Sequence, residues 1–342
     1  MRTRIGLGGG AVALALCAVP VAAQDAIESV DKPGAVVIAR AAVTQPEPAP
    51  REIAVEIAAV PAATMVDQPP SGDIDPAEAA EPTESRLPGD AMNFGRRAKA
   101  VKWEIGAIFA IVTAKNLPTV IREPQPFRFV DEGFFGRNTE QAGVDKVAHA
   151  WNTYLFTDVL YRQIADKTGG GRGAALTAAA LGLGLQTYTE VYDGIHRGSG
   201  FSMQDMLMNS MGAGFSVLRH TVPGLREKVD FRLMAVPTYK LIQFGGDKRF
   251  ENQWFLLALK GAGFKGVRDT PLRFVELHVG YHAKNFALED RLAGKPLERK
   301  PFVGIGLNVT ELFLKDRRGS PAAVARGALE YLQPPYVAVH VD

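Results

Sequence analysis

The chain of 342 residues predicts an α+β protein, with a small helical bundle followed by an antiparallel β-sheet and preceded by a disordered leader. Apolar residues recur at helical spacing between residues 98 and 226. From 227 to 342 they alternate with a period of two, which is typical of strands. The segment 24–97 is rich in Ala, Pro, Glu and Asp, a composition that does not bury a core.

Residues 1–23 have the features of a secretory signal peptide. Two arginines precede an apolar stretch, and Val21-Ala22-Ala23 forms a small-residue cleavage site. We therefore expect export to the periplasm and a place peripheral to the outer membrane. Leu16 stands before the single cysteine, Cys17, where lipidation needs a small residue, so we expect that the chain is not a lipoprotein.

Charge divides the remaining chain into an acidic leader and a basic body. Between residues 25 and 90 there are thirteen acidic and four basic residues, so this Pro-rich segment should be an extended linker. From residue 91 onward, basic residues exceed acidic ones by nine. This excess indicates either an ordinary solvated surface or attraction to cell-envelope components such as anionic membrane lipid. Because aromatic residues do not interleave a basic run, we expect no nucleic-acid partner.

Four helices are expected in the bundle. The first should end at Pro118, the second at a run of three glycines, and the fourth should begin after Ser202 as N-cap. None has the ~20 uninterrupted apolar residues of a spanning helix, which favours a water-soluble or membrane-peripheral bundle over an embedded one. The four expected ranges are 103–117, 144–167, 172–192 and 203–220.

Polar residues recur on these helices at spacings that place them on one face. They are Asp145 and His149, Glu190 and Asp193, and Asp205 and Asn209. If the faces meet, they form a cluster of carboxylates with one imidazole and one ammonium group, that of Lys146. If Glu190 is paired, Lys146 is its expected partner.

Such a cluster is compatible with three interpretations. It can hold a divalent metal ion, with Asp145, His149, Glu190, Asp193 and Asp205 as candidate ligands. It can perform acid–base catalysis, with His149 as the base and Glu190, Asp193 or Asp205 as the acid. It can also be a satisfied hydrogen-bond network that fixes helix register or binds a ligand, through Asp145, Lys146, Asp205 and Asn209.

Four motifs resemble the YfiM-like family of exported bacterial proteins, which is also described as domain of unknown function 2279. They are Glu132-Gly133-Phe134-Phe135-Gly136, Asp145-Lys146-x-x-His149, Glu190-x-x-Asp193-Gly194 and Gly200-Phe201-Ser202-x-x-Asp205-x-x-x-Asn209-x-x-Gly212-Ala213. Their order is also more loosely similar to that of VanZ-like membrane proteins. The first resemblance implies an envelope location and a helical domain, and it brings no established activity.

The sheet should contain three long strands and two short ones. The five expected ranges are 229–236, 252–264, 273–283, 301–313 and 336–341. Within 273–283, Leu277 and Val279 share one face, and His278 and His282 share the other. We expect these histidines at the surface, since they lie on the more polar face.

Together these features predict an exported cell-envelope protein that is noncatalytic and membrane-peripheral, with a polar cluster between helices. The alternative is a hydrolase, metal-dependent or acid–base, that acts on envelope lipid or cell-wall glycan. In that case His149, Glu190 and Asp193 are the catalytic candidates.

Overall fold

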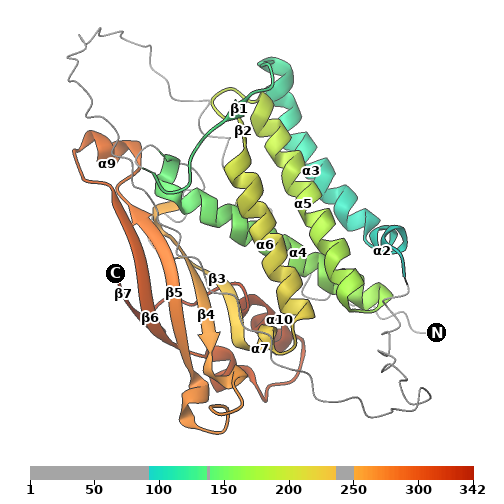
Figure 1. Cartoon of the computed structure of the whole chain (residues 1–342), viewed down its shortest axis with the longest axis vertical. Coiled ribbons are helices and arrows are strands. Elements are labelled where there is room, and N and C mark those ends of the chain that lie inside the picture. Colours follow the sequence, from blue (N-terminus) through green and yellow to red (C-terminus); the bar gives the residue numbers. More distant parts are fainter. Residues whose placement is uncertain (1–91, 137–138, 236–249) are drawn as a thin grey trace, which may run out of the picture. The chain divides into compact units, whose positions relative to one another are not determined.

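The computed structural model describes residues 92–136, 139–235 and 250–342 (Figure 1). It has the α+β fold that the sequence predicts, with helices before an antiparallel sheet. The expected signal peptide and nearly all of the expected leader lie outside the described residues. The helices are α2 (Phe94–Ala100), α3 (Lys102–Arg122), α4 (Val144–Thr168), α5 (Arg172–Ile195), α6 (Met203–Thr221), α7 (Leu225–Lys228), α9 (Leu288–Leu292) and α10 (Ser320–Leu329).

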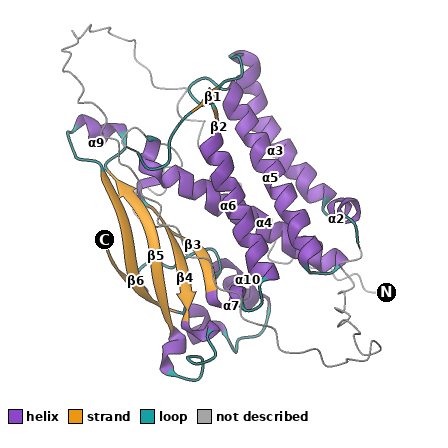
Figure 2. Cartoon of the chain, viewed as in Figure 1, coloured by secondary structure: helices purple, strands orange, loops and turns teal. Residues whose placement is uncertain are grey.

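Helices α4, α5 and α6 pack against one another and form the centre of the bundle (Figure 2). The small residues of α5 allow this, because Ala174, Ala175 and Ala178 are buried with almost no exposed surface. Helix α4 ends at Gly169, as the glycine run predicts. Ser202 caps α6, and its hydroxyl accepts a hydrogen bond of 3.2 Å from the backbone N–H of Asp205.

Helix α3 is longer than the sequence predicts, because it continues through Pro118 to Arg122. The expected end at Pro118 is wrong: proline near the end of a helix leaves only one carbonyl without its helical donor, a loss that one turn can tolerate. Within the described part of the chain, α3 alone is long and apolar enough to cross a membrane, by length and composition only. None of its residues is buried, and Trp103 is 78% exposed.

The main sheet has five antiparallel strands in sequential order, β3-β4-β5-β6-β7. They are β3 (Val229–Ala235), β4 (Gln253–Lys260), β5 (Val275–Lys284), β6 (Glu298–Leu307) and β7 (Ala338–Val341). A short parallel pair, β1 (Phe129–Val130) and β2 (Phe201–Ser202), joins the chain before α4 to the start of α6. The fourth expected strand, 301–313, is too long, because β6 ends at Leu307 and Thr310–Leu314 is helical. The side chain of Asn308 accepts a hydrogen bond from the backbone N–H of Glu311 at this change of structure.

The C-terminal segment lies along the outer edge of β3. Leu233 donates its N–H to the carbonyl of Tyr331 at 2.8 Å and accepts from the N–H of Gln333 at 2.9 Å. A few residues later the same segment becomes β7 and pairs with β6. The C-terminal segment therefore forms backbone hydrogen bonds with both β3 and β6.

The two faces of β5 are arranged opposite to our expectation. His278 is 1% exposed and His282 is fully buried, whereas Leu277 and Val279 are each 53% exposed. The expected surface histidines are therefore wrong. On the sheet face that carries these histidines, polar side chains pair with one another. The Arg232 guanidinium donates to both carboxylate oxygens of Glu276 at 2.7 and 3.1 Å.

The opposite face of the sheet, which also carries Leu277 and Val279, packs against α4 over part of its area. Trp151 and Tyr154 of α4 belong to one apolar core with Phe231 and Phe255 of the sheet. Beside this core, Arg219 of α6 donates to Asp230 of β3 at 2.7 Å. Apolar packing and buried ion pairs thus join the bundle to the sheet.

Candidate functional site

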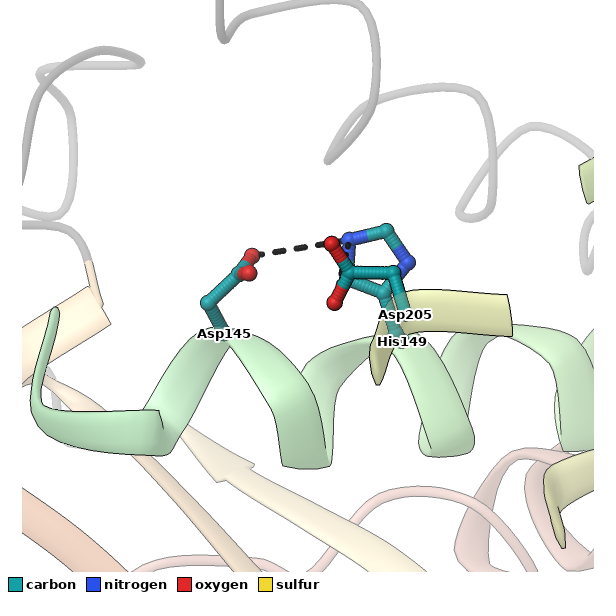
Figure 3. Close-up of side chains that lie close together, drawn as sticks. All are labelled: Asp145, His149 and Asp205. Carbon is teal, nitrogen blue, oxygen red and sulfur yellow. Dashed lines mark ion pairs between the residues drawn. The ribbon is translucent and has the colours of Figure 1, made fainter. Parts of the chain in front are cut away.

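Asp145, His149 and Asp205 lie close together where the N-terminal part of α4 meets the first turn of α6 (Figure 3). Glu190 contacts His149 from α5. Asp145 and His149 are one turn apart on α4, and Asp205 lies in the first turn of α6. Carboxylates in a first turn interact favourably with the positive end of the helix dipole, which suits both aspartates to these positions. Glu190 comes from the second half of α5 and is buried.

His149 lies at the centre of the cluster with carboxylates on both sides of its ring. Its Nε2 atom is 3.6 Å from Oδ1 of Asp145 and 3.9 Å from Oδ1 of Asp205. Its Nδ1 atom is 3.5 Å from Oε1 of Glu190. One edge of the imidazole therefore faces two aspartates and the other faces a single buried glutamate.

Lys146 is almost completely buried and balances part of this negative charge. Its Nζ atom donates to Oδ1 of Asp205 at 2.7 Å and is 3.3 Å from Oδ2 of Asp145. It also forms an ion pair with Glu132. The expected pairing of Lys146 with Glu190 is wrong, since Glu190 contacts His149 instead.

The electrostatics of the cluster raise the pKa values of several members. Burial lowers the pKa of His149, but the charges of Asp145, Asp205 and Glu190 outweigh it and raise the pKa to about 9. Burial raises the pKa of Glu190, and the neighbouring carboxylates add to this against the effect of His149, giving a pKa of about 8. Near neutral pH, both groups therefore hold protons that they would release in water.

A second polar layer lies one turn further along α4 and α6. The hydroxyl of Thr153 donates to Oδ1 of Asn209 at 2.7 Å, and the amide of Gln186 donates to Thr153 at 3.2 Å. All three side chains are buried. Gly212 follows Asn209 by one turn and lets α6 approach the backbone of α4 at Ala150.

Three of the predicted ligands have the geometry of a metal site. One atom each from Asp145, His149 and Asp205 lies within 4.8 Å of the other two, and this is the one such group among the described residues. Two carboxylate oxygens and one imidazole nitrogen suit a borderline divalent ion such as Zn²⁺ or Mn²⁺. Glu190 lies on the opposite ring nitrogen, the position of a carboxylate that orients a ligating histidine.

Asp193 is the candidate that falls outside this group of three. It lies in the last turn of α5, because this helix continues to Ile195, beyond the expected end at residue 192. Its charge still contributes to the raised pKa of Glu190.

Sequence reasoning missed the roles of two residues, Glu132 and Gln186. Glu132 precedes α4 in a loop, and its pairing with Lys146 has no periodic signal in the sequence. Its place in the Glu-Gly-Phe-Phe-Gly motif was the one available indication. Gln186 lies one turn before Glu190 on α5, at a spacing that could have identified it.

Residues 131–221, which contain the whole cluster, match the model of a family described as "Predicted periplasmic lipoprotein (DUF2279)". The match confirms the resemblance to the YfiM-like family over these residues and supports a periplasmic location. It gives no support to the looser similarity to VanZ-like proteins. Searches of curated proteins and of solved structures gave no match.

The family description also corrects one expectation. We expected that the chain is not a lipoprotein, and the family is described as a lipoprotein. The expectation depended on a single residue, Leu16, in a segment outside both the match and the described structure. The family description therefore shows that the expectation of a protein without a lipid anchor is wrong.

Proposed function

We propose that this chain is a periplasmic protein that works at a membrane surface and binds a divalent metal ion in its polar cluster. The observation that supports metal binding is the meeting of Asp145, His149 and Asp205 within 4.8 Å. The ion would join three protein ligands and leave at least one position for water or a ligand. The chemistry it would supply is that of a Lewis acid.

The chain's own residues would prepare this site. Glu190 would accept a hydrogen bond from Nδ1–H of His149, which leaves Nε2 as the ligating atom. Lys146 would hold the carboxylate of Asp205 in place, since it donates at 2.7 Å to Oδ1, the oxygen that also lies 3.9 Å from Nε2 of His149. The cluster would then remain ordered with and without the ion.

Calorimetric titration of the mature protein with Zn²⁺ and with Mn²⁺ tests the metal site. We expect one ion per chain, and at least tenfold weaker binding in Asp145→Asn and in Asp205→Asn. Asp193→Asn is the matched control, because Asp193 is a nearby carboxylate outside the group of three. No binding of either ion, or equal weakening in the control, would exclude this site.

The membrane location is supported by the apolar surface of the bundle. Helix α3 has no buried residue, and Ile111, Leu117 and Ile121 are exposed along it together with Trp103. A monomeric protein in water rarely exposes such a continuous apolar surface. Flotation of the protein with lipid vesicles, compared between wild type and a variant with Trp103→Gln and Ile121→Gln, tests this location. Undiminished flotation of the variant would contradict a role for α3.

Hydrolysis is the second candidate function, and the contact between Glu190 and His149 favours it. A histidine held by a carboxylate on one ring nitrogen can act as a general base through the other once that nitrogen has lost its proton, which the raised pKa of about 9 places at alkaline pH for His149. Envelope lipid and cell-wall glycan are the substrate classes to test. Turnover that disappears in His149→Ala and resists a chelator would indicate acid–base chemistry, whereas turnover that the chelator abolishes would indicate metal-dependent hydrolysis.

A further inference from the structure

The sheet face that packs on α4 continues beyond this helix as an exposed surface built almost entirely from aliphatic side chains. In one row, Leu257, Val279, Val303 and Val341 lie side by side across four strands. In the next row, Leu277, Ile305 and Val339 lie side by side across three strands, and Leu307 follows them on β6. These eight residues, here called the aliphatic face, are between 39% and 74% exposed.

The opposite side of the same strands is polar and buried. Glu276 and His278 alternate with Leu277 and Val279 along β5, and the polar pair has almost no exposed surface. Arg232 and Asp230 alternate with the apolar residues of β3 in the same way. Strands with polar residues inside and aliphatic residues outside are typical of sheets whose outer surface contacts lipid.

Basic residues gather at one end of the aliphatic face. The loop 261–274 joins β4 to β5, and the segment 308–319 follows β6, so both lie at the same end of the sheet. The two segments are linked where Asn308 donates its N–H to the carbonyl of Phe274 at 2.8 Å. They carry six basic and three acidic residues, and the basic ones are Lys265, Arg268, Arg273, Lys315, Arg317 and Arg318.

The three acidic residues in these segments leave a net charge of +3. Glu311 is already paired with Lys315 at 2.5 Å and lies 3.8 Å from Arg273. Phe264, Leu272 and Phe313 are exposed among the basic residues. Exposed apolar side chains beside a basic fringe match the boundary between the acyl chains and the anionic head groups of a membrane.

From these observations we propose that the aliphatic face binds the surface of an anionic lipid bilayer, with the basic end at the head groups. The inference rests on the proposed location at a membrane and identifies a second surface, separate from α3, that makes the contact. A second copy of the chain is a poorer partner, because the face lacks the aromatic and arginine residues that dominate protein interfaces. The basic fringe also needs an anionic partner, which another copy of the same fringe does not provide.

Flotation with vesicles of phosphatidylethanolamine and phosphatidylglycerol, and separately with phosphatidylcholine vesicles, tests the proposal. The test variant combines Val303→Thr, Ile305→Thr and Val339→Thr, which removes apolar surface but keeps β-branched residues suited to strands. We expect at least tenfold weaker binding to the anionic vesicles. The matched control replaces exposed residues of α6, as Met203→Gln, Leu207→Gln and Met211→Gln, and should retain most of the binding.

A second variant tests the basic end. Replacing Lys265, Arg268, Arg317 and Arg318 by Gln should reduce binding to anionic vesicles by about fivefold for each charge removed, and leave binding to phosphatidylcholine nearly unchanged. Equal loss for both lipids would contradict the charge argument.

The outcomes separate this inference from the proposed function. If the α3 variant loses binding while the threonine variant keeps it, the protein is at the membrane but the aliphatic face is not the contact. If neither variant loses binding, neither α3 nor the aliphatic face is the contact, whereas absence of binding by the wild type would refute the membrane location itself. The metal titration is independent of both outcomes. A concentration-dependent dimer in ultracentrifugation that the threonine variant abolishes would overturn the lipid assignment in favour of a second copy.

Discussion

At the scale of single residues, two buried titratable side chains, Lys146 in the polar cluster and His282 in the sheet interior, have opposite electrostatic environments. Lys146 is surrounded by Glu132, Asp145 and Asp205, so its ammonium group compensates more than one carboxylate. His282 has the opposite environment. It stacks on Trp254 with ring centroids 3.7 Å apart, and burial together with Lys284 lowers its pKa to about 4.

Lys146→Met should destabilise the protein strongly. Removing one partner of a buried ion pair leaves uncompensated charge and costs about 3 to 5 kcal/mol. Urea unfolding measures the loss. Lys167→Met is the control, because Lys167 pairs with Glu104 at the surface, where a pair is worth less than about 1 kcal/mol. Equal losses in the two variants would show that Lys146 does not compensate the cluster.

His282 should make stability depend on pH. Between about pH 6.5 and 4, the unfolded chain binds a proton that the folded protein does not bind, so the free energy of unfolding falls as pH falls through this range. Its contribution is complete above about pH 6.5. Comparing wild type with His282→Phe at about pH 7 and about pH 5 should show a steeper loss in wild type, by about 2 kcal/mol. Parallel losses would contradict this assignment.

At the scale of elements, the close packing of α4 and α6 brings the cluster together. A Cβ atom on Gly212 would overlap the carbonyl oxygen of Ala150, so only glycine allows this distance between the helices. Gly214, on the same helix, has open space around its Cα. The two glycines therefore have different roles although they are two residues apart.

Gly212→Ala should destabilise the protein, and Gly214→Ala should not. Overpacking at Gly212 costs about 1 to 3 kcal/mol and separates Asp205 from α4. At Gly214 the better helix propensity of alanine should add up to about 1 kcal/mol. Thermal unfolding and metal titration of both variants check the pair. A stable Gly212→Ala protein with unchanged metal affinity would show that the close approach is not required.

The sequence predicts most of these elements and part of the site. Ser202 and the three glycines from Gly169 mark helix ends through local chemistry, so those boundaries agree with the structure. Pro118 misleads because a helix continues through proline when its other hydrogen bonds remain. Helical spacing places Asp145 beside His149, but the approach of Glu132 depends on a loop path that no periodicity records.

At the scale of the whole molecule, a buried ionic network links the bundle with the sheet. Asp158 of α4 accepts hydrogen bonds from Arg162 at 3.0 Å and from Tyr331 at 2.5 Å. Its other oxygen lies 2.5 Å from Nε2 of His220, and Arg219 extends the network to Asp230 of the sheet. Neighbouring cations outweigh burial and hold the pKa of Asp158 well below its usual range.

Asp158→Asn should weaken the whole molecule rather than one helix. It removes the anion that His220 and Arg162 share, which should cost about 3 to 5 kcal/mol. Hydrogen exchange should then accelerate in strands β3 and β4 as well as in α4. Faster exchange confined to α4 would show that bundle and sheet are energetically independent.

The face inversion of β5 shows why the sequence does not determine the sheet completely. Alternation identifies two faces, but which face is buried depends on what covers each one. Glu276 of β5 pairs with Arg232 of β3, on the far side of β4. Because the charge of Arg232 neutralises that of Glu276, the polar face can be buried. The alternating pattern alone contains no information about that partner.

The path of the C-terminal segment determines when the protein can finish folding. Among the described residues, strand β3 has its outer-edge neighbour in Tyr331–Gln333, and β6 has its neighbour in β7, which follows them. A chain that emerges with its N-terminus first therefore leaves both strand edges unpaired until residues 331–341 have emerged. The bundle can assemble earlier from neighbouring helices, whereas the sheet must wait and is exposed to mispairing meanwhile. Loss of even the last few residues should therefore impair the maturation of the exported protein more than their small number suggests.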